Sequence, residues 1–179
     1  MKVFAAMLAC VAFAAISWQR LTPDVSLDAS QFAQTGELVT SYLRTGVRTQ
    51  FANDGRPSDV LAIDNAQRGE GRDETALSGI NFYSESDDGA KWFIDSTSGL
   101  FFEDSNELFL QDGVEILETT RDATMTTESM WLFIDDKRAV GQRDVIFTGS
   151  GSRTSGTGFE LDLVRDIATL KGRVKTDYE

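Results

Sequence analysis

The sequence predicts an all-β domain of repeated antiparallel strands, preceded by one N-terminal transmembrane helix. Three observations support this prediction. The body of the chain alternates between apolar and polar residues with a period of two, which is typical of half-buried strands. A pattern of strand, charged turn and strand recurs about every thirty residues, which indicates stacked units around one core. A short apolar run with a basic start precedes this body.

The apolar run extends from Val3 to Trp18 and follows Lys2. As a helix it reaches about 24 Å, and the flanking Trp18 and Arg20 suit the membrane interface, so that it can span a core of about 30 Å with local thinning. The flank after Arg20 is acidic, and this asymmetry places the N-terminus inside. We therefore expect a membrane anchor over residues 1–20.

Two other interpretations of this segment stay open. A cleaved signal peptide could use Ala12-Phe13-Ala14 as its processing site. A lipoprotein signal could end at Cys10, although only about six apolar residues precede this cysteine, fewer than such signals usually have. All three interpretations deliver residues 21–179 beyond the inner membrane.

The rest of the chain divides into a stalk and a β-domain. Residues 21–45 contain irregularly spaced apolar positions and predict a stalk or linker, with one short helix near Asp28. Residues 46–179 predict the β-domain, in which the polar stretch 65–78 is expected to form a loop and the glycine-rich stretch 149–158 a connection between strands. The expected strands are 47–51, 59–64, 80–84, 91–95, 99–103, 107–111, 113–118, 130–135, 138–141, 144–149, 158–164, 167–171 and 173–178.

The repeat is clearest in three stretches that begin at Gly99, Met130 and Gly158. Each contains a strand, a charged turn, a second strand and a tight break. The chain resumes after these breaks at Val114, Val145 and Val174. The nearly constant interval of about thirty residues between these valines predicts supersecondary units that share a continuous core and form a sandwich, roll or barrel.

The composition argues against several functions. The formal net charge is -12, and an acidic domain repels phosphate backbones, so we expect no nucleic-acid partner. The chain has no histidine, which removes Ser-His-Asp and Cys-His catalysis and the commonest zinc ligand. The acidic turns lack the pattern of a calcium loop, and the glycine-rich stretch lacks the Gly-Lys-Ser/Thr of a P-loop. We predict no catalytic residue, no metal and no cofactor.

One face of the predicted strands is apolar throughout. By the alternation of side chains along each strand, this face contains Trp92, Ile94, Leu108, Leu110, Val114, Ile116, Phe159, Leu161 and Leu163. On the residues alone, a filled core is favoured over an open groove for acyl chains, because apolar strand faces normally pack against one another.

Several stretches resemble the LptC family, the bitopic component of lipopolysaccharide export. They are Trp92-Phe-Ile, LFLQDGVEI over 108–116, the glycine-rich approach to Gly158-Phe-Glu-Leu, and the closing GRVKTDYE from Gly172. Their order and spacing carry the resemblance, and the closing stretch is the most specific. The similarity covers about residues 40–179. Gly158 is the glycine of the Gly158-Phe-Glu-Leu motif in the third of these stretches.

The resemblance implies an open, twisted β-jellyroll in the periplasm, anchored in the inner membrane by a single helix. Lipopolysaccharide would come from the LptB/LptF/LptG ABC transporter, pass along a groove formed by the nine apolar residues, and leave to LptA. This implication reverses the preference for a filled core. Neighbouring proteins of the bridge would add their strands to the edge strands of this domain. The resemblance assigns the C-terminal strand, with Val174, Thr176 and Tyr178, to the junction with LptA.

Two other functions stay open. A structural β-domain that binds protein partners and no lipid would have a closed core. An envelope hydrolase would use a pair of the abundant carboxylates. Mass spectrometry of retained lipid separates the first alternative from a lipid carrier, and loss of an activity on changing a single acid would support the second.

Overall fold

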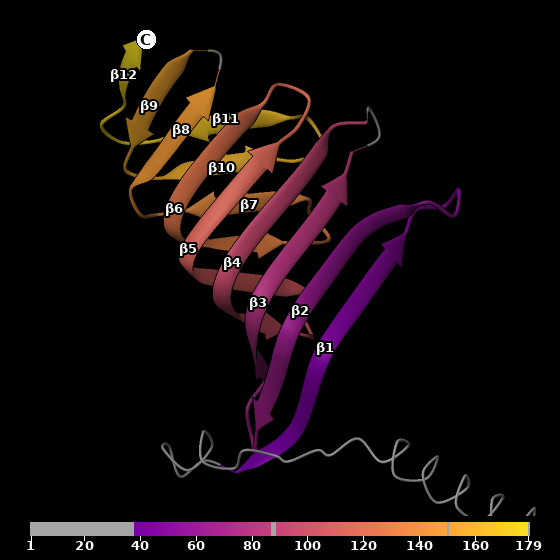
Figure 1. Ribbon diagram of the computed structural model, residues 1–179. Coiled ribbons are helices and arrows are strands. Elements are labelled where there is room, and N and C mark those ends of the chain that lie inside the picture. Colours follow the sequence, from indigo (N-terminus) through magenta and orange to yellow (C-terminus); the bar gives the residue numbers. More distant parts are fainter. Residues whose placement is uncertain (1–37, 87–88, 150, 179) are drawn as a thin grey trace, which may run out of the picture. The chain divides into compact units, whose positions relative to one another are not determined.

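The computed structural model describes residues 38–86, 89–149 and 151–178, which form twelve antiparallel strands (Figure 1). The strands are β1 (Val39–Phe51), β2 (Pro57–Gly69), β3 (Glu74–Glu85), β4 (Lys91–Phe102), β5 (Glu107–Glu118), β6 (Ala123–Phe133), β7 (Arg138–Gly141), β8 (Val145–Gly149), β9 (Ser152–Gly156), β10 (Phe159–Asp162), β11 (Ile167–Leu170) and β12 (Lys175–Tyr178). In this described part of the chain, no helix is long and apolar enough to cross a membrane. The expected anchor over 1–20 lies outside the described residues.

The sheet is continuous from β1 to β6 and then divides into two branches. Residues 131–133 of β6 pair with β7, which continues to β10 and β11. Residues 124–127 of the same strand pair with β8, which continues to β9 and β12. Each of β1, β11 and β12 therefore pairs with only one other strand among the described residues. The sheet is open and does not close into a ring.

The long strands bend where they cross one line. Pairing is interrupted between Asp95 and Ser98 on β4, and between Gln111 and Val114 on β5. The backbone is left-handed on this line at Gly79, with φ 62°, where an added Cβ would overlap the carboxylate of Asp64 on the neighbouring strand. Glycine is therefore required there. Beyond β6 the line continues as breaks between β7 and β8, β9 and β10, and β11 and β12.

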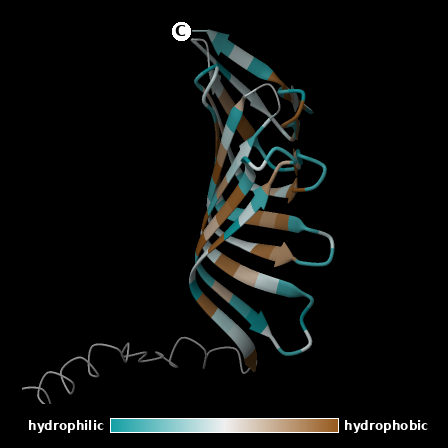
Figure 2. Cartoon of the chain, turned by 90° about the vertical axis from the view of Figure 1, so that its right-hand side faces the viewer, coloured by the Kyte–Doolittle hydropathy of each residue, from teal (hydrophilic) through white to brown (hydrophobic). Residues whose placement is uncertain are grey.

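This bend line divides the sheet into two layers that pack face to face, as seen from the side in Figure 2. The first leaf contains residues 46–51, 57–63, 80–85, 91–96, 114–118 and 123–127 with β8, β9 and β12. The second leaf contains residues 39–44, 65–69, 74–78, 98–102, 107–111 and 129–133 with β7, β10 and β11. The turns at the ends of the strands form the free margins of the two leaves, opposite the bend line.

The sequence repeat corresponds to this architecture. The breaks before Val114, Val145 and Val174 all fall on the bend line. The turns within the three repeat units contain a residue with positive φ at the equivalent position: Asn106 (φ 52°), Lys137 (φ 50°) and Asp166 (φ 56°). Successive turns are also stacked, because the next unit donates backbone N–H groups to the carbonyl oxygens of Asn106 and Lys137, at 3.3 and 2.8 Å.

Several sequence predictions about element boundaries were wrong. The expected separate strands 91–95 and 99–103 are the single strand β4, and 107–111 and 113–118 are the single strand β5. The domain begins near Leu38 rather than at residue 46, because β1 starts at Val39 and includes the end of the expected stalk. The expected loop over 65–78 is mostly strand, with the turn limited to 70–73. Residues 123–129 belong to β6, and the glycine-rich connection contains β9. The remainder of the stalk, residues 21–37, lies outside the described residues.

The strand ends over 65–69 and 74–78 were missed because mostly polar residues occupy them. On β2 and β3, Asn65 donates a hydrogen bond to Ser78, and Tyr42 donates one to Asn65, so that the outward face is polar. Only Ala66 and Leu77 are buried in this part. Backbone pairing with neighbouring strands, rather than an apolar period, determines the structure here.

Candidate functional site

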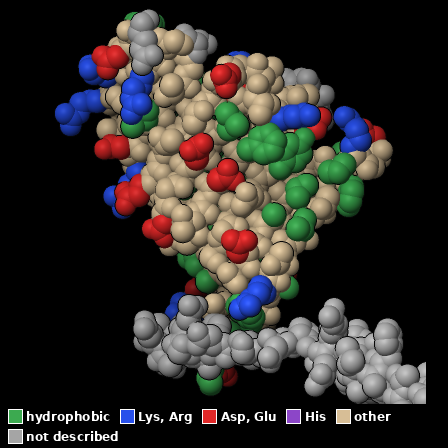
Figure 3. Space-filling model, in the orientation of Figure 1, with side chains coloured by type: hydrophobic (Ala, Val, Ile, Leu, Met, Phe, Trp, Pro, Cys, Tyr) green, Lys and Arg blue, Asp and Glu red, His purple; other side chains and the backbone are tan. Residues whose placement is uncertain are grey.

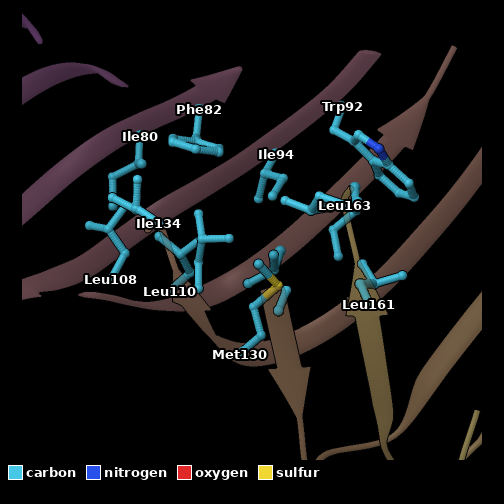
Figure 4. Packing of buried hydrophobic residues seen from close by; sticks show 14 of the residues in the cluster. Ile80, Phe82, Trp92, Ile94, Leu108, Leu110, Met130, Ile134, Leu161 and Leu163 are labelled. Carbon is cyan, nitrogen blue, oxygen red and sulfur yellow. The ribbon is translucent and has the colours of Figure 1, made fainter. Parts of the chain in front are cut away.

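The inner faces of the two leaves pack into one apolar interior (Figure 4). All nine residues of the predicted groove are at most 4% exposed and belong to a single cluster. A fully buried side chain of this kind contributes about 1.5–3 kcal/mol relative to an exposed one. The structure therefore brings the nine residues together, in an interior that side chains fill. The use of this interior as a lipid groove remains a prediction.

The inward-facing residues of the first leaf form rows of cross-strand partners. One row is apolar and consists of Leu61, Phe82, Ile94, Ile116 and Met125. The row nearest the margin is polar: Asp59 pairs with Ser84, Ser84 with Trp92, and Trp92 with Glu118. All four are buried. The interior thus becomes more polar toward its free margin.

Among the described residues, three polar contacts join the two leaves along the margin, and we call them the margin contacts. Arg48 on β1 donates a hydrogen bond from Nη1 to Asn106 Oδ1 at 2.6 Å. Lys137 forms an ion pair with Asp59 and donates to Ser84 Oγ at 3.0 Å. Arg121, in the turn between β5 and β6, forms an ion pair with Asp166.

The second-leaf partner of each margin contact occupies the same position in its repeat unit. Asn106, Lys137 and Asp166 are the three turn residues with positive φ. None of these three residues was predicted from the sequence, because the acidic turns were considered only as possible calcium loops. Their repeated spacing in the sequence is the signal that could have identified them as equivalent.

A cavity of about 250 Å³ lies between the margins beside Lys137. Its apolar walls come from both leaves and include Pro57 from the first and Leu163 and Val164 from the second. Leu163 is the member of the predicted groove that reaches this cavity. Between 38 and 178, in the residues described, no group of three or more acids or cysteines could hold a metal ion.

The predicted partner residues lie at an exposed end of the sheet. Val174 is 50% exposed and Tyr178 is 84% exposed. Thr176 forms a hydrogen bond with Thr154 of β9 at 3.0 Å. Gly158 lies at the break between β9 and β10, where its carbonyl accepts the Lys171 N–H at 2.7 Å. A Cβ at Gly158 would lie 3.1 Å from the Gly141 carbonyl oxygen, with φ at 146°, so this close approach favours glycine.

The fold and the interior together define a class: an open, folded-over β-jellyroll with an apolar interior, in which the end strands of the described sheet each have one edge without a partner strand. The family model described as lipopolysaccharide-assembly, LptC-related matches residues 4–179, and the chain belongs to this family. The resemblance seen in the sequence is therefore confirmed.

A solved structure of LptH from Pseudomonas aeruginosa, described as the LptA homologous periplasmic component of the conserved lipopolysaccharide transport device, is also similar. Its TM-score is 0.52 at 10% sequence identity, and the match covers 75% of this chain and 95% of that one. This likeness confirms an LptA-like fold of one open antiparallel sheet. No curated protein matches the chain.

Proposed function

We propose that this protein is a periplasmic section of the lipopolysaccharide transport bridge and that its interior holds acyl chains in transit. The observation that carries the proposal is the single apolar cluster that extends through both leaves. Family membership and the LptA-like fold support it. The net charge of -12 also supports transit rather than storage, because carboxylates, several of which are exposed on the face drawn in Figure 3, repel phosphorylated sugars.

Acyl chains reach this interior when the two leaves separate at their margins. The open topology supports such a movement, because β1 is not paired with β11 or β12. The bend line then acts as the hinge, and the three margin contacts are the polar interactions that must break. Of these, the Arg121–Asp166 pair is the more exposed ion pair, since the Arg121 side chain is 58% exposed against 21% for Lys137.

In this proposal the two ends of the sheet have different partners. β1 comes first in the described chain, so its edge is the end that receives lipopolysaccharide from the LptB/LptF/LptG transporter in this proposal. β11 and β12 form the other end and pass the lipid to LptA. The protein is held at the inner membrane by its N-terminal segment, and it catalyses no reaction.

The first test is photo-crosslinking to lipopolysaccharide in cells. A photoreactive amino acid at Leu163, which lines the cavity, should capture lipopolysaccharide. One at Glu115, which is exposed on the outer face of β5, should not. Capture at neither position, together with no lipid retained by the purified protein, would favour a structural β-domain that binds only proteins.

The second test concerns the LptA junction. A photoreactive amino acid at Tyr178, on the terminal strand β12, should capture LptA, because an unpaired edge is a template for strand addition. Arg72, in the turn between β2 and β3, is the matched exposed control. Equal capture of LptA at both positions would remove the case for this edge.

A further inference from the structure

The margin row of the first leaf contains one polar group without a partner. Asp59 and Ser84 are both contacted by Lys137. Glu118 accepts backbone N–H groups from Thr120 and Arg121 at 2.7 and 2.9 Å. The fourth member is Trp92, and its indole Nε1 has no hydrogen-bond partner among the described residues.

This unpaired donor is costly for an isolated protein. Trp92 is only 4% exposed, so water does not replace the missing partner at its surface. A buried N–H without an acceptor destabilises the folded state, and buried indole groups usually find a partner. Phenylalanine would fill much of the same volume without a donor. Tryptophan at this position therefore indicates a use for the N–H group.

The position of Trp92 indicates what the acceptor is. Trp92 and Leu163 belong to the same apolar cluster and are drawn near each other in Figure 4, and Leu163 lines the cavity between the margins. The next row inward, which includes Phe82 and Ile94, is apolar. Trp92 is thus at the boundary between a polar margin and an apolar interior. In an acylated amphiphile, the ester or amide carbonyl occupies the same boundary between head group and chain.

We propose that the Trp92 indole N–H donates a hydrogen bond to the carbonyl oxygen that links an acyl chain to its head group. The inference rests on the proposed function, in which the chain itself occupies the apolar rows. It gives Trp92 a specificity role: the site prefers acyl lipids over alkyl ethers of the same length, because only the acyl lipid satisfies the buried donor.

The test uses two probes that differ only in this carbonyl: monohexadecanoylglycerol, an ester, and monohexadecylglycerol, its ether. Full-length protein in amphipol is labelled with ¹⁵N at its indole groups. We expect the ester to bind about tenfold more tightly than the ether, as one hydrogen bond in a dry site provides. The Trp92 indole proton should shift downfield with the ester and not with the ether.

Two variants assign the effect. Trp92→Phe should lose the preference for the ester and should bind both probes equally, while its thermal stability stays close to that of the wild type. Trp131→Phe, on the outer face of β6, is the matched control and should keep the preference. The indole resonance of the wild-type protein gives the same answer without a variant.

The outcomes separate this inference from the proposed function. Equal binding of both probes by the wild type, or an ester preference that survives in Trp92→Phe, would overturn the role of Trp92 and leave the lipid-binding interior in place. Binding of neither probe would overturn both.

Discussion

The two halves of the sheet cross the same bend line in different ways. Strands β1 to β6 have 11 to 13 residues and pass through the line without ending. Strands β7 to β12 have four or five residues and stop at it. A continuous strand is hydrogen-bonded to its neighbours in both leaves. Where the strands end at the line, the two leaves are joined only by the covalent connection between one strand and the next. The continuous half therefore fixes the angle between the leaves.

The largest expected effect comes from breaking the bend in the continuous half. Gly79→Ala adds a Cβ at positive φ against Asp64, and we expect it to destabilise the domain by about 2–4 kcal/mol. Gly172→Ala is the matched change in the broken half, with φ 76° and the Thr157 hydroxyl in the way. It should cost about 1 kcal/mol, because β11 and β12 are mostly exposed and can adjust. Urea unfolding measures both, and equal losses would show that the two halves fold as one rigid unit.

The next effect concerns the contact that ties the broken half to the continuous half. Lys137→Met leaves the buried Asp59 carboxylate without its cation, which should cost about 2–3 kcal/mol. Adding Asp59→Asn should recover part of this loss, since no uncompensated charge remains. Urea unfolding of the single and double variants checks the prediction. If the double variant is as unstable as the single one, packing rather than charge holds this margin.

A smaller effect is expected at the exposed margin contact. Arg121→Glu places a like charge against Asp166 and should cost about 0.5–1 kcal/mol, because the Arg121 side chain is 58% exposed. The same change should also increase the rate at which maleimide labels a cysteine introduced by Leu161→Cys in a Cys10→Ser background, because the leaves separate more often. The charge exchange Arg121→Glu with Asp166→Arg should restore slow labelling. Labelling that stays fast in the exchanged protein would contradict a role for this ion pair in closing the interior.

The smallest effect is a pH dependence at the turn between β10 and β11. Asp162 accepts backbone N–H groups from Arg165 and Val164, and the Arg165 hydrogen bond is the main cause that lowers the pKa of this carboxyl. Because the pKa is lower in the folded protein, the ionised carboxylate stabilises the fold at pH values above the unfolded pKa of about 3.9. This stabilisation is lost as the pH falls through the folded pKa. Below about pH 4, the melting temperature of Asp162→Asn should therefore decrease less steeply with falling pH than the melting temperature of the wild type. Parallel curves would show that the turn does not depend on this charge.

The sequence predicted the parts of the fold in which apolar side chains alternate. The strands through Ile94, Leu110 and Ile116 were expected, and these residues lie in the common interior. The polar strand ends were not expected, because pairing of backbone groups leaves no trace in hydropathy. The margin contacts were also missed, since Lys137 and Asp59 are 78 residues apart in the chain and meet only after the sheet bends. The missing hydrogen bond at Trp92 Nε1 could not be predicted, because it depends on which atoms surround this nitrogen in the folded protein, and the hydropathy pattern does not contain that information.

The division of β6 into two branches has a consequence for assembly. Because one branch ends in β11 and the other in β12, the end of the molecule offers one unpaired edge from each leaf. A second jellyroll that adds strands to both edges would prolong both layers at once, and the apolar interior would continue across the joint without a polar wall. The same geometry permits a copy of this chain to add its β1 edge, and head-to-tail contacts that do not close build filaments. The number of units in such a fibre, and so the distance it spans, is then set by relative concentrations of partners rather than by the fold.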